Sequence, residues 1–269
     1  NPGELTVDNC ETDIADDVPA FYKKYFRCVT ITTSGDSVVI NSKNLPPHQS
    51  HYYEASSPNY IPWESQGTGY NDNNPNEIAE QDLTVTIPNS PVSRGLTINA
   101  SLVDGIVGSS TNEYGMGTQG VALDSASMFN PLAAPGDDIE DEKWTFDWNS
   151  GHPEMSGNYH YHSTTPGPLK VLAAVGLTSD TTPGEAAIEL YGIMCDGALV
   201  MGCTELNGDT PSSDDFDSQN GHSHDLVDEE GVTHFSNRYH THICPDTFTA
   251  HKFTPEIQPY QDCSVTGSG

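Results

Sequence analysis

The chain has 269 residues, and its 9 Lys and Arg against 39 Asp and Glu give a formal net charge of -30 at pH 7. Such a charge repels phosphate backbones and anionic membrane surfaces, which excludes nucleic acid as a partner. No apolar run approaches the roughly 18 residues of a membrane-spanning helix. Three explanations of the acidity are left open: solubility in a salty medium, cation binding, or attraction to a basic extracellular partner.

The N-terminal residues predict an acidic leader over 1–28, followed by β structure. Residues 18–28 are aromatic and basic and could form a short helix. Residues 29–33 and 37–40 are β-branched runs around a Ser-Gly-Asp turn, which is typical of a hairpin. The next loop, 45–53, carries His48 and His51 after two prolines, and we treat it as a candidate third arm of a site.

The middle of the chain is irregular, with two further predicted strands. Residues 56–82 are rich in Pro, Asn and Gly and indicate a loop. Residues 83–88 alternate apolar and polar side chains and end at a proline, which predicts a strand, and 96–99 predict another. Asn99 begins the sequon Asn-Ala-Ser and is a glycosylation candidate in a suitable host.

Two acidic runs, 137–142 and 214–217, interrupt the second half of the chain. Their spacing does not match an EF-hand loop, although acidic loops of this kind could still bind calcium.

One short motif occurs twice. Tyr159-His160-Tyr161-His162 returns as Tyr239-His240-Thr241-His242. Side chains alternate between the two faces of a strand, so in each copy both imidazoles lie on one face and the tyrosines on the other.

The residues upstream of each copy also match. Phe-Asp and Gly-His recur at identical spacing, first around Asp147 and His152 and then around Asp217 and His222. Farther upstream, a Gly-containing strand ends at an aspartate in both copies. We therefore predict repeat units over 120–162 and 192–242, related by a pseudo-twofold axis. Residues 168–176, between the units, are apolar and fit either a helix or a buried strand.

The six cysteines contain no Cys-x-x-Cys spacing, which disfavours a zinc knuckle or a thioredoxin-like site. The chain begins without methionine, as after removal of a signal peptide, and we expect a secreted protein, periplasmic if the host is bacterial, with disulfides. Pairing between sequence neighbours is our preference among the 15 connectivities that six cysteines allow. The preferred pairs are Cys10 with Cys28, Cys195 with Cys203, and Cys244 with Cys263.

These motifs resemble the YHYH-domain family of extracellular or periplasmic proteins. The matching motifs are the Leu-Pro-Pro-His motif that ends at His48, the Gly-to-Asp strands, the two Gly-His elements and the two histidine strands. Together they cover about residues 29–263. Thr241 and Cys195 depart from the pattern, in which a tyrosine and a small apolar residue are usual. The resemblance implies a β-rich secreted fold and no settled activity.

Together these features predict a mainly β, sandwich-like single domain over 29–263 with the internal duplication, and a short tail over 264–269. Paired His-x-His strands are typical of metal sites, because two neutral imidazoles face one ion. We expect four imidazoles to converge in a single site, with three further histidines beside them: His160, His162, His240 and His242, helped by His48, His152 and His222.

Nitrogen-rich ligand sets favour copper, and three histidines with an open position suit zinc. Asp147 and Asp217 are expected to orient the rings, and Tyr159, Tyr161 and Tyr239 to lie nearby, more as core aromatics than as redox partners.

The favoured function is metal binding or sequestration. No esterase elbow, His-Glu-x-x-His or phosphate loop occurs, which argues against an enzyme. Two alternatives are kept: a self-assembling subunit of an extracellular filament or sheath, and a metal-dependent enzyme.

Overall fold

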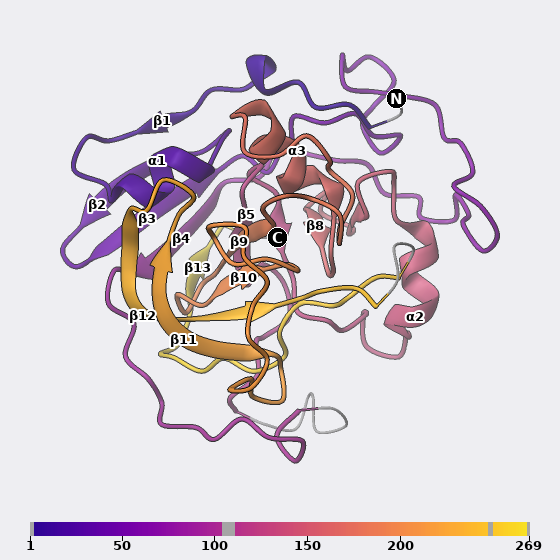
Figure 1. Cartoon of the computed structure of the whole chain (residues 1–269). Helices are drawn as coiled ribbons and strands as arrows, with labels where there is room; N and C mark the ends of the chain where they lie inside the picture. Colours follow the sequence, from indigo (N-terminus) through magenta and orange to yellow (C-terminus); the bar gives the residue numbers. More distant parts are fainter. Residues whose placement is uncertain (1–2, 104–110, 247–249, 268–269) are drawn as a thin grey trace.

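The computed structural model describes residues 3–103, 111–246 and 250–267. Two β-sheets, three short α-helices and two 3-10 turns make up its regular structure, and long irregular segments connect them (Figure 1). The prediction of a mainly β fold is confirmed.

The smaller sheet has five strands in the order β1-β2-β3-β4-β13. Their bounds are Asp13–Ile14, Thr30–Ser34, Ser37–Ser42, Leu83–Pro88 and Ser264–Thr266. β2 and β3 form the predicted hairpin, closed by the pair Ser34 and Ser37, and β4 is the predicted strand over 83–88. Residues on β3 alternate between buried and half-buried, because one face of the strand packs into the core.

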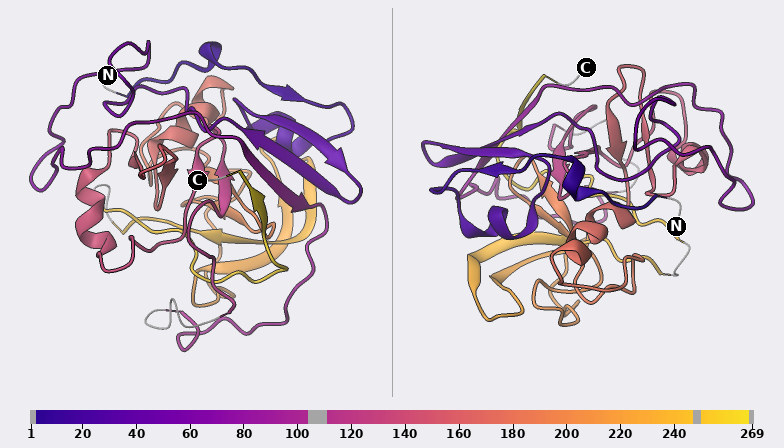
Figure 2. Two further views of the ribbon diagram at one scale, coloured as in Figure 1. Left: turned by 180° about the vertical axis from the view of Figure 1, so that it is seen from behind. Right: turned by 90° about the horizontal axis from the view of Figure 1, so that it is seen from above.

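Both ends of the chain contribute to this sheet. β1 comes from the predicted leader and pairs with β2, while β13 comes from the predicted tail and pairs with β4. The helix expected over 18–28 is α1 (Ala20–Tyr25). Its Phe21 ring lies 4.9 Å from the ring of Phe235 on β12, so the helix joins the two sheets (Figure 2).

The larger sheet has eight strands in the order β11-β12-β10-β9-β5-β6-β8-β7. In that order the bounds are Gly221–Val227, Thr233–His242, Leu199–Met201, Leu190–Met194, Gly120–Ala122, Ser127–Met128, Tyr159–Tyr161 and Gly151–Pro153. The Gly-His elements form the outermost strands, and the histidine strands lie next to them.

The strand order reads the same from both edges. On each side of the central antiparallel pair β5–β9 there is an antiparallel neighbour, then a parallel pairing to the histidine strand, then an antiparallel edge strand. A pseudo-twofold duplication of units 120–162 and 192–242 would give this strand order, and the duplication stays a prediction.

The central pair also explains the glycine that begins each unit. A Cβ atom on Gly120 would lie 2.6 Å from the Ile193 carbonyl oxygen, and one on Gly192 would lie 2.3 Å from the Val121 carbonyl oxygen. Side chains at these positions would force the two strands apart.

The other segments lie around the sheets. Residues 168–176 belong to helix α3 (Pro166–Ala174), which settles the open choice between helix and strand. Shorter elements are η1 (Val7–Asn9), α2 (Ile139–Glu142) and η2 (Lys143–Thr145). The strand expected over 96–99 is wrong: Leu102 and Val103 donate backbone hydrogen bonds to Asn99, which turns the chain there. Asn99 itself is exposed.

All six cysteines are paired, but only one of the preferred pairs is right. Cys10 bonds Cys28, whereas the other bonds are Cys195–Cys263 and Cys203–Cys244. The local pairing failed because the parallel contact of β10 with β12 brings Cys203 beside Cys244. Cys195, unusual for the family pattern, attaches the end of β9 to the C-terminal segment.

No helix in the described part of the chain is long and apolar enough to cross a membrane.

Candidate metal centres

Three imidazoles meet on one face of the β7–β8 pair. His152 on β7 is directly opposite His160 on β8, and His162 follows two residues later on the same face. The ring centroid of His160 lies 4.7 Å from that of His152 and 4.7 Å from that of His162.

Glu142, the last residue of α2, completes this group, which we call the first cluster. Its Oε1 lies 3.0 Å from Nε2 of His152 and 3.9 Å from Nε2 of His162. All four residues offer a ligand atom within 4.8 Å of one another. Glutamate and histidine donors at this separation could hold one metal ion.

The outer ring nitrogens of the first cluster are held by the protein. His160 donates from Nδ1 to the Asn158 carbonyl at 2.9 Å, and His162 donates from Nδ1 to the Asn130 carbonyl at 2.6 Å. Nδ1 of His152 lies 2.7 Å from the Thr145 hydroxyl. These contacts leave the Nε2 lone pairs facing one another, as in histidines that bind metals.

Several inward-facing atoms have no other partner. Nε2 of His152, Nε2 of His162 and Oε2 of Glu142 are buried and make no hydrogen bond of good geometry, although Nε2 of His152 lies 3.0 Å from Oε1 of Glu142. A buried polar atom without a partner is costly, and a bound cation would satisfy all three at once.

Burial keeps the first cluster ready for a cation. It lowers the pKa of His162 to about 4 and that of His160 well below its ordinary value, so both rings are neutral near pH 7. Burial alone would raise the pKa of Glu142, but its contacts with His152 and His162 outweigh burial and lower it. The cluster therefore presents the neutral nitrogens of His160 and His162 beside one carboxylate.

A second cluster is built in the same way on β11 and β12. Oε1 of Glu205 lies 3.3 Å from Nε2 of His222, 3.2 Å from that of His224 and 3.5 Å from that of His242. Oε2 of the same carboxylate lies 3.3 Å from Nε2 of His240. The four imidazoles thus surround one carboxylate.

The Nδ1 atoms of the second cluster are again held from outside. His240 donates to the Arg238 carbonyl at 2.9 Å, and His242 donates to the Gly202 carbonyl at 2.8 Å. Asp215 lies 3.0 Å from Nδ1 of His222, and the Asp225 carbonyl lies 2.8 Å from that of His224.

The inner atoms of the second cluster repeat the electrostatics of the first. Nε2 of His240 and Oε2 of Glu205 are buried and lie 3.3 Å apart, but neither makes a hydrogen bond of good geometry. Burial lowers the pKa of His240 and would raise that of Glu205, but the neighbouring His240 and His242 lower the pKa of this carboxyl below its usual range.

The two clusters correspond residue by residue. His152, His160, His162 and Glu142 of the first match His222, His240, His242 and Glu205 of the second. One structural difference is His224, an imidazole that the first cluster lacks. It joins Glu205, His222 and His240 in a group with ligand atoms within 4.8 Å of one another, and His242 is not part of that group.

The expectation of one shared site is therefore wrong. Strands β10, β9, β5 and β6 separate β8 from β12, which corresponds to about 24 Å across the sheet at about 4.8 Å per strand. Each His-x-His pair combines with the Gly-His strand of its own half instead, because that strand is its antiparallel neighbour.

Asp147 and Asp217 do not orient the imidazoles, which corrects a second expectation. The Tyr159 hydroxyl donates to Asp147 at 2.9 Å, and the Tyr239 hydroxyl donates to Asp217 at 2.7 Å. Each carboxylate also accepts backbone N–H groups of the turn before the Gly-His strand, including those of Gly151 and Gly221. Backbone carbonyls fix the rings of the His-x-His strands.

The three tyrosines are core residues on the face opposite the imidazoles. Tyr159 is 0% exposed, Tyr161 1% and Tyr239 8%. With their hydroxyls bonded to carboxylates, the favoured interpretation as core aromatics holds.

Gly151 lies beneath one of these tyrosines, and we expect Gly151→Ala to destabilise the protein. A Cβ there would lie 2.5 Å from the Tyr159 hydroxyl and 2.9 Å from the His160 carbonyl oxygen. Overpacking of this kind costs about 1–3 kcal/mol of unfolding free energy, measurable by urea titration. Gly115→Ala is the matched control, since its nearest neighbour would be 3.6 Å away. Equal losses in both variants would contradict this account.

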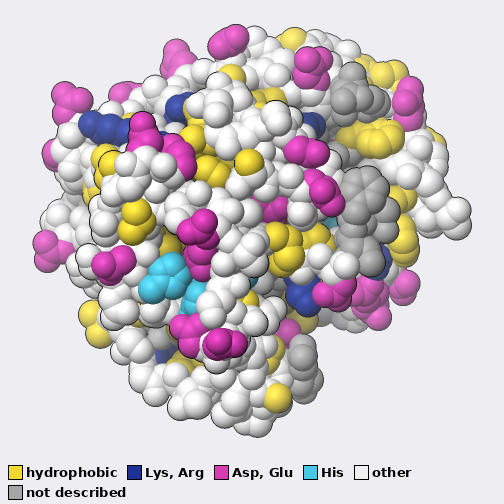
Figure 3. Space-filling view, in the orientation of Figure 1, with side chains coloured by type: hydrophobic (Ala, Val, Ile, Leu, Met, Phe, Trp, Pro, Cys, Tyr) yellow, Lys and Arg dark blue, Asp and Glu magenta, His cyan; other side chains and the backbone are white. Residues whose placement is uncertain are grey.

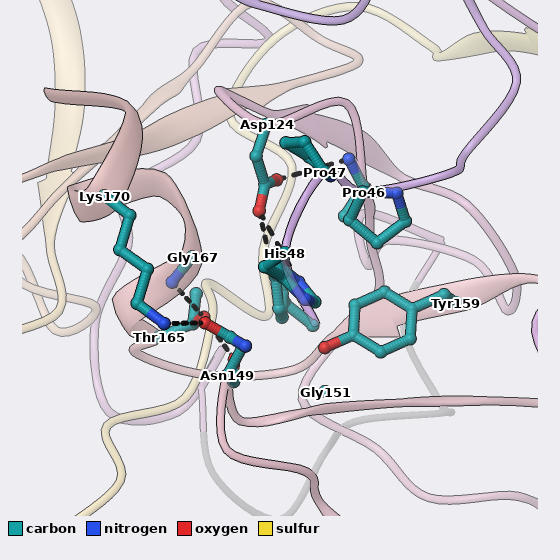
Figure 4. Close-up of polar contacts among 12 residues, drawn as sticks. Pro46, Pro47, His48, Asp124, Asn149, Gly151, Tyr159, Thr165, Gly167 and Lys170 are labelled. Carbon is teal, nitrogen blue, oxygen red and sulfur yellow. Dashed lines mark hydrogen bonds and ion pairs between the residues drawn. The ribbon is translucent and has the colours of Figure 1, made fainter. Parts of the chain in front are cut away.

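His48 lies outside both clusters, which is a further correction. Its side chain is 0% exposed, and its Nε2 lies 2.9 Å from the Tyr161 hydroxyl, which donates to Asp124. It therefore belongs to the tyrosine face of β8 (Figure 4). In the same region the Lys170 ammonium donates to Asn149 at 2.8 Å. Leu-Pro-Pro-His thus contributes to a buried polar network in the core.

The departure at Thr241 is accommodated by the same network in the second half. Tyr161 donates to Asp124, but the hydroxyl of Thr241 donates to the Leu199 carbonyl instead. Asp196, the counterpart of Asp124, accepts a hydrogen bond from Tyr114 at 2.9 Å. A tyrosine from another part of the chain thus replaces the missing one.

Three cluster residues were not among the predicted ligands: Glu142, Glu205 and His224. His222-Ser223-His224 is itself a His-x-His element, which would have indicated His224. Glu142 ends one of the two acidic runs, and Asp215 from the other contacts His222, so both runs serve histidine clusters. No local pattern marks Glu205.

No curated protein and no solved structure matches the chain. A family model described as YHYH protein matches residues 84–231, a range that contains the first cluster and ends before His240 and His242. Since this match spans more than half of the 269 residues, the chain belongs to the YHYH protein family.

Proposed function

We propose that this is a secreted metal-binding protein with two mononuclear centres, one in each histidine cluster. The observation that supports this most directly is the orientation of the rings. Outer nitrogens are bonded to the protein, while inner nitrogens converge on a glutamate, and several of these inner atoms are buried without a hydrogen bond.

The donor types favour copper, with zinc as the second choice. Imidazole nitrogen suits both ions, and the four nitrogens around Glu205 suit the nitrogen-rich coordination of Cu(II). The first cluster, with three histidines and one carboxylate, also fits a tetrahedral zinc ion. Calcium prefers six to eight oxygen ligands, so it is disfavoured at both clusters.

Binding or sequestration is favoured over catalysis because the ligands are largely enclosed. His152, His160 and His162 are each at most 3% exposed. An extracellular or periplasmic location is consistent with three disulfides and no free cysteine, since such bonds persist in oxidising compartments.

Protein purified without chelator and dialysed against Cu(II) or Zn(II) is expected to hold two ions per chain. His160→Ala and His240→Ala should each reduce this to one, and the double variant to none, because each removes a central ligand of one cluster. Elemental analysis by mass spectrometry measures the ratio. His51→Gln alters a histidine outside both clusters and should keep two ions. Stoichiometric metal in the double variant, or none in the unaltered chain, would refute the proposal.

A further inference from the structure

We propose that the second centre, unlike the first, admits a small external ligand to its metal ion. The ligand class is a neutral or cationic polar molecule. This inference rests on the proposed function, since it assigns a role to one of the two centres.

His224 is the feature that separates the centres. Its side chain is 39% exposed, whereas those of His222, His240 and His242 are at most 3% exposed. It nevertheless reaches inward, with Nε2 at 3.2 Å from Glu205. The second centre thus has one ligand that touches both solvent and the cluster interior.

The first half has no equivalent of this imidazole. Two residues after His152, at the position that His224 occupies relative to His222, stands Glu154. Its carboxylate accepts hydrogen bonds from the backbone of Ser156 and Asn158 in the turn between β7 and β8. It is therefore held away from the first cluster.

A cavity of about 290 Å³ opens beside the second centre. Both Glu205 and His224 line it, so a molecule in the cavity meets two groups of the cluster directly. The hollow next to the first cluster is lined by residues 136–138, Asp141 and Glu142, with no imidazole among its described lining residues.

An aromatic ring further encloses the first cluster. The ring of Phe129 stacks on that of His160 at 3.7 Å and covers one face of this imidazole. The stacking of Phe146 on His162 does not separate the centres, because Phe216 stacks on His242 in the second cluster.

The lining of the cavity defines the class of ligand. Asn207, Thr210 and Ser212 offer hydrogen bonds, while Asp209 and Asp225 add negative charge. Carboxylates at the entrance repel anions and favour neutral or positively charged molecules. Histidine and carboxylate side chains are neighbours at the surface of the face in Figure 3, where carboxylates far outnumber basic groups.

Single-centre variants loaded with Cu(II) test this inference. His160→Ala leaves the second centre and His240→Ala leaves the first, and electron paramagnetic resonance reports the ligands of each copper. Imidazole, a neutral probe, is expected to shift the signal of the His160→Ala protein and to leave that of the His240→Ala protein unchanged. Azide, an anionic probe of similar size, should shift the former only at much higher concentration.

A third variant tests the site of entry. Adding His224→Gln to the His160→Ala protein should strengthen imidazole binding, because a coordination position facing the cavity is vacated. Equal responses from both centres, no response from the second, or no effect of His224→Gln would overturn the inference. If the unaltered protein bound no copper at all, the proposed function itself would be refuted.

Discussion

Replacing the Cys203–Cys244 disulfide with two serines is expected to weaken metal binding at the second centre and to leave binding at the first centre unchanged. Cys203 precedes Glu205 by two residues, and Cys244 follows His242 by two, so the bond fixes the loop of the carboxylate to the histidine strand. Without it, ion affinity should fall about 10–100-fold, as when other groups that support ligands are lost.

The same change should lower stability throughout the chain. The bond has a sequence separation of 41, and the loop-closure relation then gives about 4 kcal/mol of unfolding free energy. Cys10→Ser/Cys28→Ser is the matched control: its separation is 18, which gives about 3 kcal/mol, and its cysteines contact Val7 and Thr12 rather than a cluster.

Elemental analysis and urea unfolding on both double variants separate the two effects. The Cys10–Cys28 variant should be destabilised while keeping both ions. If it loses metal as readily as the Cys203–Cys244 variant, general destabilisation explains the loss and the disulfide has no special role at the second centre.

Local periodicity was enough to predict the histidine strands. Alternation along Tyr159-His160-Tyr161-His162 places both imidazoles on one face, and the structure has them there, opposite buried tyrosines. The hairpin over 30–42 and the strand over 83–88 were predictable for the same reason, since their burial follows the alternation of the sequence.

Partner choice was not predictable, because it depends on strand order. The two His-x-His pairs are similar enough to suggest a shared site, but sequence similarity cannot say whether related strands are neighbours. The sheet places β5 and β9 at the centre and the histidine strands toward opposite edges. His152 therefore lies beside the His-x-His pair of the first unit, and His222 lies beside that of the second unit.

The carboxylates were hidden for another reason. Glu142 comes from a short helix ten residues before His152, and Glu205 from a loop 17 residues before His222, so the two halves supply equivalent groups from different local structures. A repeat-based comparison finds neither, because only the position in space is shared. Disulfide pairing failed similarly: Cys203 and Cys244 meet through the parallel β10–β12 contact.

Acidification from pH 7 to pH 5 is expected to destabilise the metal-free protein strongly. Burial lowers the pKa of His48 and of His162 to about 4, and that of His160 well below its ordinary value of 6.5. The unfolded chain therefore takes up protons at these residues before the folded chain does. The stability that these neutral imidazoles contribute is fully present above about pH 6.5 and is lost as the pH falls toward 4.

The size of this effect follows from the number of rings. Each contributes about 1.4 kcal/mol per pH unit within that window, so three rings give about 4 kcal/mol per unit. Asp124 acts in the opposite direction, because burial raises its pKa to about 6 and the folded chain holds that proton more tightly. Burial likewise raises the pKa of Glu189 and Asp196, but it also lowers the pKa of His51, His240 and His251. More imidazoles than carboxyls are therefore shifted, and a net loss of several kcal/mol is left, against a typical total of about 5–15 kcal/mol.

Urea unfolding in the presence of a chelator at pH 7 and pH 5 measures this loss. His48→Gln removes one buried imidazole that belongs to neither cluster, and should reduce the pH dependence by about 1.4 kcal/mol per unit while leaving metal binding at pH 7 intact. Metal-loaded protein should resist down to a lower pH, because bound ions hold the rings neutral until protons displace them. Identical unfolding midpoints at the two pH values would mean that the buried imidazoles are already reachable by protons in the folded chain.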